Sequence, residues 1–338
     1  MFLVKKIICF GTRDYEKSIM LEIAKKHNYI LEFNGQFLDD SNYKLALGYE
    51  IVLLRGIKPL TYTSMLDLKN HGLKCLVTRT AGYNNLDLEG AKKLNLEVSY
   101  APGYSPNAIS ELTLSLALDL IHNVSYICDK TKDFDFTIND NSFVKETRDL
   151  VIGIIGTGRI GATTAKLFHG IGSKVLGYDP YPNPKNKDIL TYVDFDTLLK
   201  NSDVICIHAP YIKGSNDNLI NIDTVKKMKK GVIIINSARG DLVDISSINK
   251  GFDLGIIKGF GADVIKNETS YFGKDLKEKK TNDIEINKLI SRYPNVLITP
   301  HIASATTHAL IDMMEISLTN IDEYYKVGFS KNSLTKKQ

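Results

Sequence analysis

Features that would assign this chain to a specialised class of protein are scarce. It has only four cysteines in 338 residues, Cys9, Cys75, Cys128 and Cys206, and none of them forms a C-x-x-C pair. Most of them lie in apolar runs, where reduced, buried thiols are expected. We therefore expect a cytoplasmic protein without a disulfide framework, and we predict no metal site.

Long apolar runs and a strong charge imbalance are also missing. No segment reaches the roughly 18 uninterrupted apolar residues of a membrane span. Residues 1–14 are apolar at first, but lysines interrupt them and no small-residue cleavage site follows, so we interpret them as a first strand and not a signal peptide. The net charge of +4 is small, and no basic stripe is interleaved with aromatic residues. These observations argue against membrane and nucleic-acid partners.

What remains is the composition of an ordinary globular protein, with 43% hydrophobic and 24% charged residues. The length is sufficient for two domains that each bury a core. No internal repeat or low-complexity segment is apparent. The lysine-rich end, residues 330–338, is expected to be a frayed tail.

The most informative stretch is VIGIIGTGRIG, residues 151–161. A β-branched run predicts a buried strand, and Gly156, Gly158 and Gly161 follow in the spacing G-x-G-x-x-G. In a dinucleotide-binding turn the first glycine permits the tight turn, the second admits the pyrophosphate, and the third lets the next helix pack closely. That helix, expected over residues 159–171, directs its positive end at the phosphates.

A second strand, KVLGYD, ends at Asp179, where an acidic residue can bind a ribose 2′-hydroxyl. No arginine adjoins Asp179, which favours NAD over NADP as the cofactor. The alternative is a structural strand–helix turn that binds nothing. The complete order of strand, glycines, helix, strand and acid favours the cofactor site.

The first hundred residues alternate between expected strands and helices, which predicts a small, doubly wound parallel sheet. Its strands are expected at 5–10, 29–33, 51–55, 73–78 and up to residue 99, with helices at 14–27, near 61–70 and from residue 87. A long apolar helix at 105–123 covers more than one face, so we expect it to pack between domains or subunits. Residues 129–149 are polar and are expected to cross the surface.

The second half predicts six parallel strands, at 151–155, 174–178, 203–207, 232–236, 259–262 and 296–298. We therefore predict an α/β protein of two doubly wound parallel-sheet domains: a Rossmann NAD-binding domain and a flavodoxin-like substrate domain, with a cleft between them. Hinges are expected near residues 102 and 300. The substrate domain then comprises residues 1–102 plus 301–338, and the NAD-binding domain residues 103–300.

Three polar residues in the second half have the chemistry for reducing a 2-oxo acid. Arg239 can bind a carboxylate through two parallel hydrogen bonds. His301 can exchange a proton with a carbonyl oxygen, and Glu268 behind it would fix the tautomer. Taken singly, Arg239 could be a salt-bridged helix opener, Glu268 an exposed loop acid and His301 a cap after a proline. Their joint occurrence with one cofactor fold favours catalysis.

The chain resembles the D-2-hydroxyacid dehydrogenase family over nearly its whole length. The matching blocks are RTAGYNN (79–85), GYSPNAISEL (103–112), GIIGTGRIG (153–161), GYDPYPN (177–183), HAP (208–210), INSARGDLVD (235–244), DV (263–264) and PNVLITPH (294–301). The resemblance implies that Arg239, Glu268 and His301 are catalytic, with His301 as the proton donor. It also implies a homodimer formed through the cofactor domains.

The resemblance further implies which residues line the two binding sites. The NAD site would comprise Gly156, Gly158, Arg159, Ile160, Gly161, Asp179, His208, Ala209, Pro210, Asn216, Ser237, Ala238, Arg239 and Asp263. The backbone amides of Ala81, Gly82 and Tyr83 would hold the substrate carboxylate, with Tyr104 nearby. One departure is Lys266, which stands where the family often has a further acid two residues before the catalytic glutamate.

Within the family, LLRG (53–56), IHAPYIK (207–213), SARGDLVD (237–244) and SYFGKDL (270–276) look closest to (R)-2-hydroxyglutarate dehydrogenases. Arg55 ends a strand of the substrate domain and would supply the cation that a second carboxylate needs. The alternative for Arg55 is a salt bridge to Glu50 or Asp67. We therefore predict 2-oxoglutarate as the substrate. D-lactate dehydrogenase, (R)-2-hydroxyisocaproate dehydrogenase and a non-catalytic NAD(H)-sensing protein are the alternatives.

Overall fold

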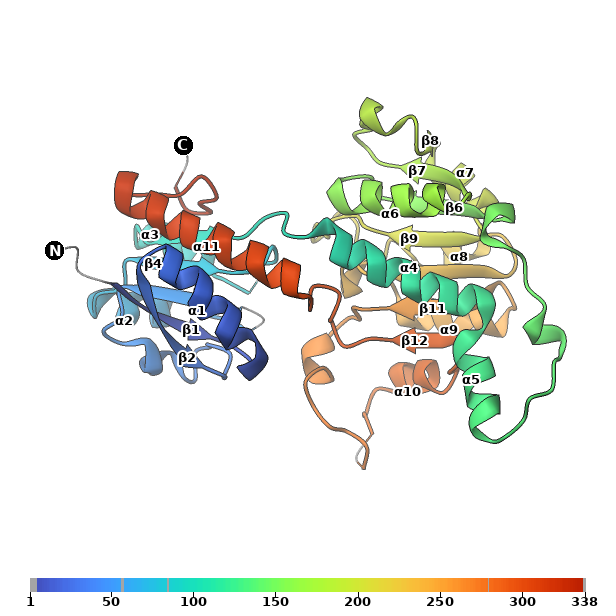
Figure 1. Ribbon diagram of the computed structural model, residues 1–338, viewed down its shortest axis with the longest axis horizontal. Coiled ribbons are helices and arrows are strands. Elements are labelled where there is room, and N and C mark those ends of the chain that lie inside the picture. The colour runs from blue at the N-terminus through green and yellow to red at the C-terminus, as the bar shows by residue number, and fades with distance from the viewer. Residues whose placement is uncertain (1–4, 56–57, 84, 279, 337–338) are drawn as a thin grey trace. The chain divides into compact units, whose positions relative to one another are not determined.

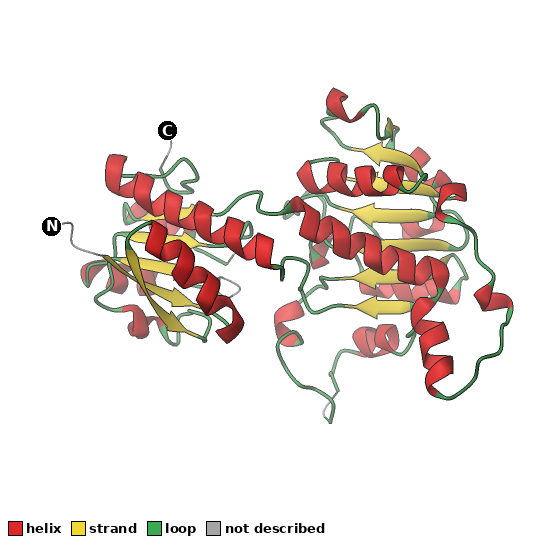
Figure 2. Cartoon of the chain, in the orientation of Figure 1, coloured by secondary structure: helices red, strands yellow, loops and turns green. Residues whose placement is uncertain are grey.

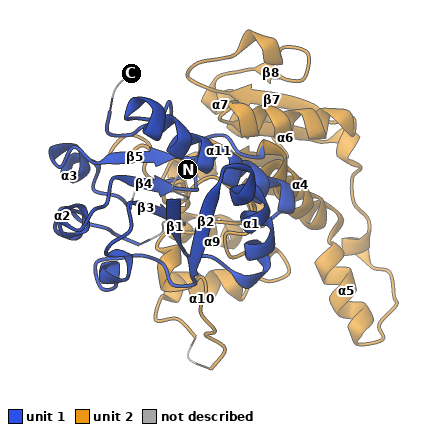
Figure 3. Ribbon diagram, turned by 60° about the vertical axis from the view of Figure 1, so that its left-hand side comes forward, with its two compact units in different colours: residues 1–105, 305–338 blue, residues 106–304 orange. Residues whose placement is uncertain are grey.

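The computed structural model describes residues 5–55, 58–83, 85–278 and 280–336. The chain forms two compact units, residues 1–105 with 305–338 and residues 106–304 (Figure 3). The sequence-based boundaries, at 102/103 and 300/301, lie a few residues before these. Gly56 of LLRG and Asn84 of RTAGYNN lie outside the described residues.

Unit 1 is a five-stranded sheet in which all the paired strands are parallel, with the order β2-β1-β3-β4-β5. This is the flavodoxin-like order expected for the first domain. Its strands are β1 (Lys5–Phe10), β2 (Tyr29–Asn34), β3 (Ile51–Leu54), β4 (Cys75–Thr78) and β5 (Glu97–Tyr100). Its helices are α1 (Lys17–Lys26), α2 (Tyr62–Asn70), α3 (Leu88–Lys93) and α11 (Thr307–Val327).

Alternate residues of these strands enter two separate cores because successive side chains point to opposite faces of a sheet. Ile7 and Cys9 pack with α1 and α11, whereas Ile8 and Phe10 pack with α2 and α3. The helix after residue 301 thus completes unit 1, although it comes last in the sequence (Figure 1). Its Glu315 and Asp322 both contact the His27 ring at the end of α1.

The prediction of a frayed C-terminal tail is wrong for residues 330–336. Ser330 is fully buried, and Leu334 donates its backbone N–H to Val98 at 2.7 Å. Ser333 forms an antiparallel bridge to Ser99 and donates to the buried carboxylate of Glu97 at 2.9 Å. The segment therefore covers the edge of β5, whose unpaired backbone groups would otherwise need other partners.

Unit 2 is a seven-stranded parallel sheet with the order β12-β11-β10-β9-β6-β7-β8. Its strands are β6 (Val151–Ile155), β7 (Lys174–Tyr178), β8 (Thr191–Tyr192), β9 (Val204–Ile207), β10 (Val232–Asn236), β11 (Ile257–Ala262) and β12 (Val296–Ile298). The direction in which successive strands are added to the sheet reverses between β6 and β9, as it does in dinucleotide-binding sheets. The prediction of two doubly wound parallel sheets is confirmed, but the two-residue strand β8 was not predicted.

Helices cover both faces of this sheet, as Figure 2 shows. They are α4 (Pro106–His122), α6 (Arg159–Gly170), α7 (Phe195–Asn201), α8 (Ile222–Lys226), α9 (Ile245–Asp253) and α10 (Ile284–Ile290). Helix α5 (Val124–Lys132) follows α4, has no buried residue and extends away from the sheet (Figure 1). Helix α4 packs on α6, β10 and β11 within unit 2. Its apolar side chains Leu116 and Leu120 therefore belong to the core of its own domain.

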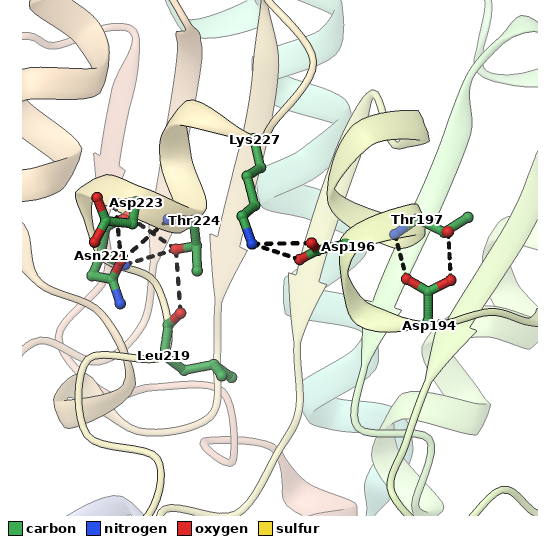
Figure 4. Close-up of polar contacts among 8 residues, drawn as sticks. All are labelled: Asp194, Asp196, Thr197, Leu219, Asn221, Asp223, Thr224 and Lys227. Atoms are coloured by element: carbon green, nitrogen blue, oxygen red, sulfur yellow. Dashed lines mark hydrogen bonds and ion pairs between the residues drawn. The ribbon is translucent and has the colours of Figure 1, made fainter.

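Short polar contacts fix where the helices on the opposite face begin (Figure 4). The Asp194 carboxylate accepts the Thr197 N–H at 2.8 Å at the start of α7. Asn221 accepts two backbone N–H groups at the start of α8. Such caps contribute about 1 kcal/mol each. The exposed salt bridge between Lys227 and Asp196, whose charged atoms lie 2.9 Å apart, contributes less to the free energy of unfolding.

Among the described residues, no helix is long and apolar enough to cross a membrane. Cys9, Cys75 and Cys206 are buried and free, as expected, whereas Cys128 is exposed.

Candidate active site

In the glycine-rich turn after β6, each of the three glycines lies in the surroundings that its expected role requires. Gly156 has a φ of +87°, and a Cβ there would lie 2.6 Å from the Ala209 nitrogen. A Cβ on Gly161 would overlap the carbonyl oxygen of Gly156. By contrast, a Cβ on Gly158 would meet nothing within 4 Å, so this backbone faces open space. The turn therefore packs tightly on the protein side and remains accessible to a pyrophosphate.

Asp179 follows β7 and is held beside this turn. Its Oδ2 accepts the Thr157 N–H at 2.7 Å, and its Oδ1 accepts the Tyr181 N–H at 2.9 Å. Thr157 also contacts the Tyr192 hydroxyl from β8 at 2.9 Å. The carboxylate is thus oriented at the position where a ribose 2′-hydroxyl is bound in such folds. These residues fit an NAD cofactor.

His208 follows β9 and belongs to a buried polar chain. Ser110 donates to the Ile160 carbonyl, and Thr164 donates to the Ser110 hydroxyl. Both hydroxyl hydrogens are then used, so Nε2 of His208 donates to Thr164 Oγ1, 2.9 Å away. Burial lowers the pKa of His208 to about 3, so the ring is neutral. Its Nδ1 is buried and has no hydrogen-bond partner in the described structure.

The remaining predicted cofactor residues lie on neighbouring turns. Ala209 packs against Gly156, as described above. Asn216 closes its own loop, since its carboxamide contacts the Pro210 carbonyl and the Ile212 N–H, each at 2.7 Å. The prediction that Pro210 and Asn216 line the NAD site stays a prediction.

The turn after β10 carries Arg239. The Asn236 side chain accepts the Ala238 N–H at 3.1 Å and donates to the Arg239 carbonyl at 3.0 Å. The guanidinium of Arg239 is half-buried and donates to the Ala238 carbonyl at 2.7 Å. Ser237 contacts the Thr113 hydroxyl of α4 at 2.7 Å. Arg239 precedes the short helix Gly240–Leu242, as the alternative interpretation expected, but it forms no salt bridge with any described residue.

Glu268 and His301 form a direct pair, although 33 residues separate them. Glu268 Oε1 lies 2.6 Å from His301 Nδ1. The imidazole is 43% exposed and the carboxylate 25% exposed, so the pair is accessible from one side. Because Nδ1 faces the carboxylate, Nε2 is the nitrogen available to a substrate. The lysine at position 266 is exposed and leaves this pair intact.

Asp263 lies beneath this pair and is 1% exposed. Its Oδ1 accepts from Thr299 Oγ1 at 2.6 Å and from the Ile302 N–H at 2.8 Å, and its Oδ2 accepts the Ala303 N–H at 2.9 Å. Its carbonyl oxygen accepts the His301 N–H at 3.0 Å. Within the described residues, Asp263 thus supports the turn of His301. Direct contact of Asp263 with NAD stays a prediction.

In unit 1, Arg55 follows β3 and is largely buried. Neither Glu50 nor Asp67 pairs with it; Glu50 instead binds Lys74 at 2.6 Å. Its nearest carboxylate is Glu16, 3.8 Å from Nη1. Glu16 is already bound by the two terminal guanidinium nitrogens of the buried Arg79, Nη1 at 3.3 Å and Nη2 at 2.8 Å. Burial lowers the pKa of Arg55, as do the charges of Arg13 and Arg79, and Glu16 opposes these effects.

The other predicted substrate residues also follow strands of unit 1. Ala81, Gly82 and Tyr83 lie in the turn after β4, where Thr80 Oγ1 donates to the Gly82 carbonyl at 2.8 Å. The Tyr83 ring contacts Tyr100 edge-on, with centroids 5.2 Å apart. Tyr104 is half-buried after β5. Their contact with substrate stays a prediction.

Sequence reasoning missed the residues that support these turns. They are Asn236, Thr113, Ser110, Thr164, Thr157 and Tyr192. Asn236 could have been found, because an asparagine at the end of a buried strand and before a turn commonly closes that turn with its side chain. The others required knowledge of which helices pack together.

Comparison with known proteins is consistent with this geometry. Residues 114–303 match the model of the D-isomer-specific 2-hydroxyacid dehydrogenase NAD-binding domain. An aromatic 2-oxoacid reductase of Clostridium sporogenes is 34% identical over 328 residues, covering 97% of this chain and 98% of the relative. A D-lactate dehydrogenase of Staphylococcus aureus is 35% identical over 311 residues, covering 92% and 93%.

Among solved structures, the NAD complex of a D-isomer-specific 2-hydroxyacid dehydrogenase from Lactobacillus delbrueckii ssp. bulgaricus is similar, with a TM-score of 0.85 and 34% identity. The alignment covers 98% of this chain and 100% of that one. Fold and site together define a two-domain, NAD-dependent oxidoreductase. The chain belongs to the D-isomer-specific 2-hydroxyacid dehydrogenase family and acts on the CH–OH group of 2-hydroxy acids.

The open space at Gly158 yields a test of the cofactor site. Gly158→Ala should fold normally, because its Cβ meets no protein atom, but it should weaken NADH binding by about tenfold or more, a loss of ~1.4 kcal/mol. Gly170→Ala is the matched control, since Gly170 lies in open space at the far end of the same helix. It should leave NADH affinity unchanged. NADH fluorescence titration with thermal melts measures both, and wild-type affinity in Gly158→Ala would contradict the assignment.

Proposed function

We propose that the enzyme interconverts 2-oxoglutarate and (R)-2-hydroxyglutarate. The observation that carries the chemistry is the 2.6 Å contact between Glu268 and His301. The choice of acid rests on Arg55, a largely buried cation whose nearest carboxylate among the described residues is already bound by Arg79. A buried guanidinium gains most from a carboxylate that can pair with it directly.

In this mechanism Arg239 binds the substrate's carboxylate and ketone oxygen. When bound, NADH supplies the hydride that adds to the ketone carbon. His301 donates the proton from Nε2 to the ketone oxygen, while Glu268 holds Nδ1 and stabilises the charged ring. In the reverse direction His301 accepts that proton. Arg55 pairs with the distal carboxylate.

His301 can be tested as the proton donor by substitution. His301→Ala should lower kcat for 2-oxo acid reduction by about 10²- to 10⁴-fold, the usual contribution of a positioned acid. NADH affinity should change less than about threefold, because fold and cofactor turn are untouched. His169→Ala, at an exposed position of α6, is the control. Turnover of His301→Ala near the wild-type rate would exclude the assignment.

The substrate is tested by comparing kcat/KM for 2-oxoglutarate, pyruvate, 2-oxoisocaproate and phenylpyruvate, followed by NADH absorbance. We expect 2-oxoglutarate to be preferred. Arg55→Ala should lower its kcat/KM roughly 10- to 100-fold, the value of a charged hydrogen bond, and change pyruvate less than about threefold. Lys58→Ala, which removes an exposed cation paired with Asp39, is the control.

A different order of preference would select another member of the family. Preference for pyruvate or an aromatic acid would match the relatives named D-lactate dehydrogenase and aromatic 2-oxoacid reductase. Arg55 would then have only a structural role, as a cation beside the carboxylate of Glu16.

We also propose that the enzyme is a homodimer. Support comes from the segment after α5, where four large apolar side chains are strongly exposed. They are Phe134 (85%), Phe136 (73%), Ile138 (86%) and Phe143 (92%). Neighbouring exposed apolar side chains of this size are typical of association surfaces.

Light scattering after gel filtration should give twice the mass of the chain. Phe136→Asp combined with Phe143→Asp should give a monomer with the wild-type melting temperature, since neither side chain contributes to a core. Ile284→Asp, which changes an exposed apolar residue elsewhere in unit 2, should remain dimeric. A monomeric wild type, or a dimeric double variant, would refute the proposal.

A cytoplasmic location is the last part of this proposal. It is supported by the free thiols of Cys9, Cys75 and Cys206, which are buried and unpaired, as is usual in reducing compartments.

A further inference from the structure

The turn that carries Arg239 is closed by one buried side chain. Asn236 is the last residue of β10 and is fully buried. Both polar atoms of its carboxamide are used on the turn: Oδ1 accepts the Ala238 N–H at 3.1 Å, and Nδ2 donates to the Arg239 carbonyl at 3.0 Å. These two backbone groups belong to peptide planes on either side of the Ala238–Arg239 unit. Fixing both planes restricts the direction in which the Arg239 side chain leaves the backbone.

The same asparagine joins this turn to the turn that carries His301. Its backbone carbonyl accepts the Asp263 N–H at 2.9 Å. Asp263 in turn holds the backbone at residues 301–303 through its own carbonyl and carboxylate. A displacement of Asn236 would therefore shift the backbone of both turns, because hydrogen bonds connect it to each of them.

Two further contacts restrict the turn from other directions. Thr113 uses its hydroxyl hydrogen on the Ile109 carbonyl, so the Ser237 hydroxyl donates to Thr113 Oγ1 at 2.7 Å. A Cβ on Gly240 would overlap the backbone carbonyl of Ile265, so the turn lies directly against the segment that leads to Glu268. The carboxamide of Asn236 thus holds the turn from within by two hydrogen bonds, while Thr113 and the backbone of Ile265 pack against the turn from outside.

We infer that Asn236 is a positioning residue that orients Arg239 for binding the substrate carboxylate. This inference rests on the role that the proposed function gives to Arg239. Asn236 itself is buried and touches no substrate. A misplacement of about 1 Å can lower the rate of an enzyme by about 10²-fold. Loss of the two Asn236 hydrogen bonds should therefore be measurable as a lower affinity for a carboxylate.

The experiment measures binding of oxamate, an amide analogue of a 2-oxo acid that cannot accept hydride, to the enzyme saturated with NADH. Oxamate binding is followed by NADH fluorescence in wild type, Asn236→Ala, Arg239→Ala and the double variant. Asn236→Ala should weaken oxamate binding about 10- to 100-fold in the presence of Arg239 and less than about threefold in its absence. A general structural defect would act equally in both backgrounds.

Asn249→Ala is the matched control. Asn249 is also a buried asparagine of unit 2, and its carboxamide donates to the Glu285 carbonyl at 2.9 Å and accepts from Arg292 Nε at 3.2 Å. It should lower the melting temperature comparably and leave oxamate affinity unchanged. Should Asn236→Ala fail to fold, Asn236→Ser retains a hydroxyl that can accept from Ala238, and its oxamate affinity should still fall about tenfold.

The outcomes separate this inference from the proposed function. If Arg239→Ala leaves oxamate affinity unchanged, Arg239 is not the carboxylate-binding residue and the proposed function fails at that point. If Arg239→Ala weakens oxamate but Asn236→Ala does not, or weakens it equally in both backgrounds, only the positioning role is overturned.

Discussion

The turns that carry Arg239 and His301 depend on how two buried polar residues, Asn236 and Asp263, form their hydrogen bonds at the carboxyl edge of the sheet of unit 2. Asp263 is almost completely buried, and burial raises the pKa of its carboxyl against the hydrogen bonds from Thr299, Ile302 and Ala303. A buried carboxylate without partners is strongly unfavourable, so this arrangement holds the surrounding backbone in one conformation. His301 accordingly has a φ of +56°, a value that a non-glycine residue rarely adopts without support.

Parallel strands explain why residues so distant in the sequence come together. Strands β6, β7, β9, β10, β11 and β12 all end at one edge of the sheet, so the turns that follow them are neighbours. The glycine turn, Asp179, Arg239 and His301 each follow a different strand. The sheet fixes where each turn begins, and local contacts such as those of Asn236 and Thr157 fix the direction of the side chains. In the proposed mechanism, the orientation of the catalytic side chains therefore depends on residues that take no part in the chemistry.

This division explains what the sequence could predict. The two parallel sheets, the glycine turn and the Glu268–His301 pair follow from local periodicity and family motifs, and the structure contains all of them. The polar chain of Ser110, Thr164 and His208 joins two helices and a strand end, and no local pattern encodes that packing. Residues 330–336 were wrongly predicted to fray, because the lysines in this part of the sequence are typical of tails. The residues that pair with β5 are serine and leucine, whose alternation is too short to signal a strand.

The ion cluster of unit 1 bears on substrate choice through the cost of burying charge. Arg55 and Arg79 both face the carboxylate of Glu16, which Arg79 binds through its two terminal nitrogens. The two arginines therefore carry more positive charge than the carboxylate of Glu16 balances. Burial is the largest cause of the lowered pKa of Arg55, and the charges of Arg13 and Arg79 lower it further. A ligand carboxylate would relieve this excess, whereas the methyl group of pyruvate or an aromatic ring would leave it uncompensated. The proposed dicarboxylate substrate would thus account for a largely buried arginine that lacks a carboxylate of its own.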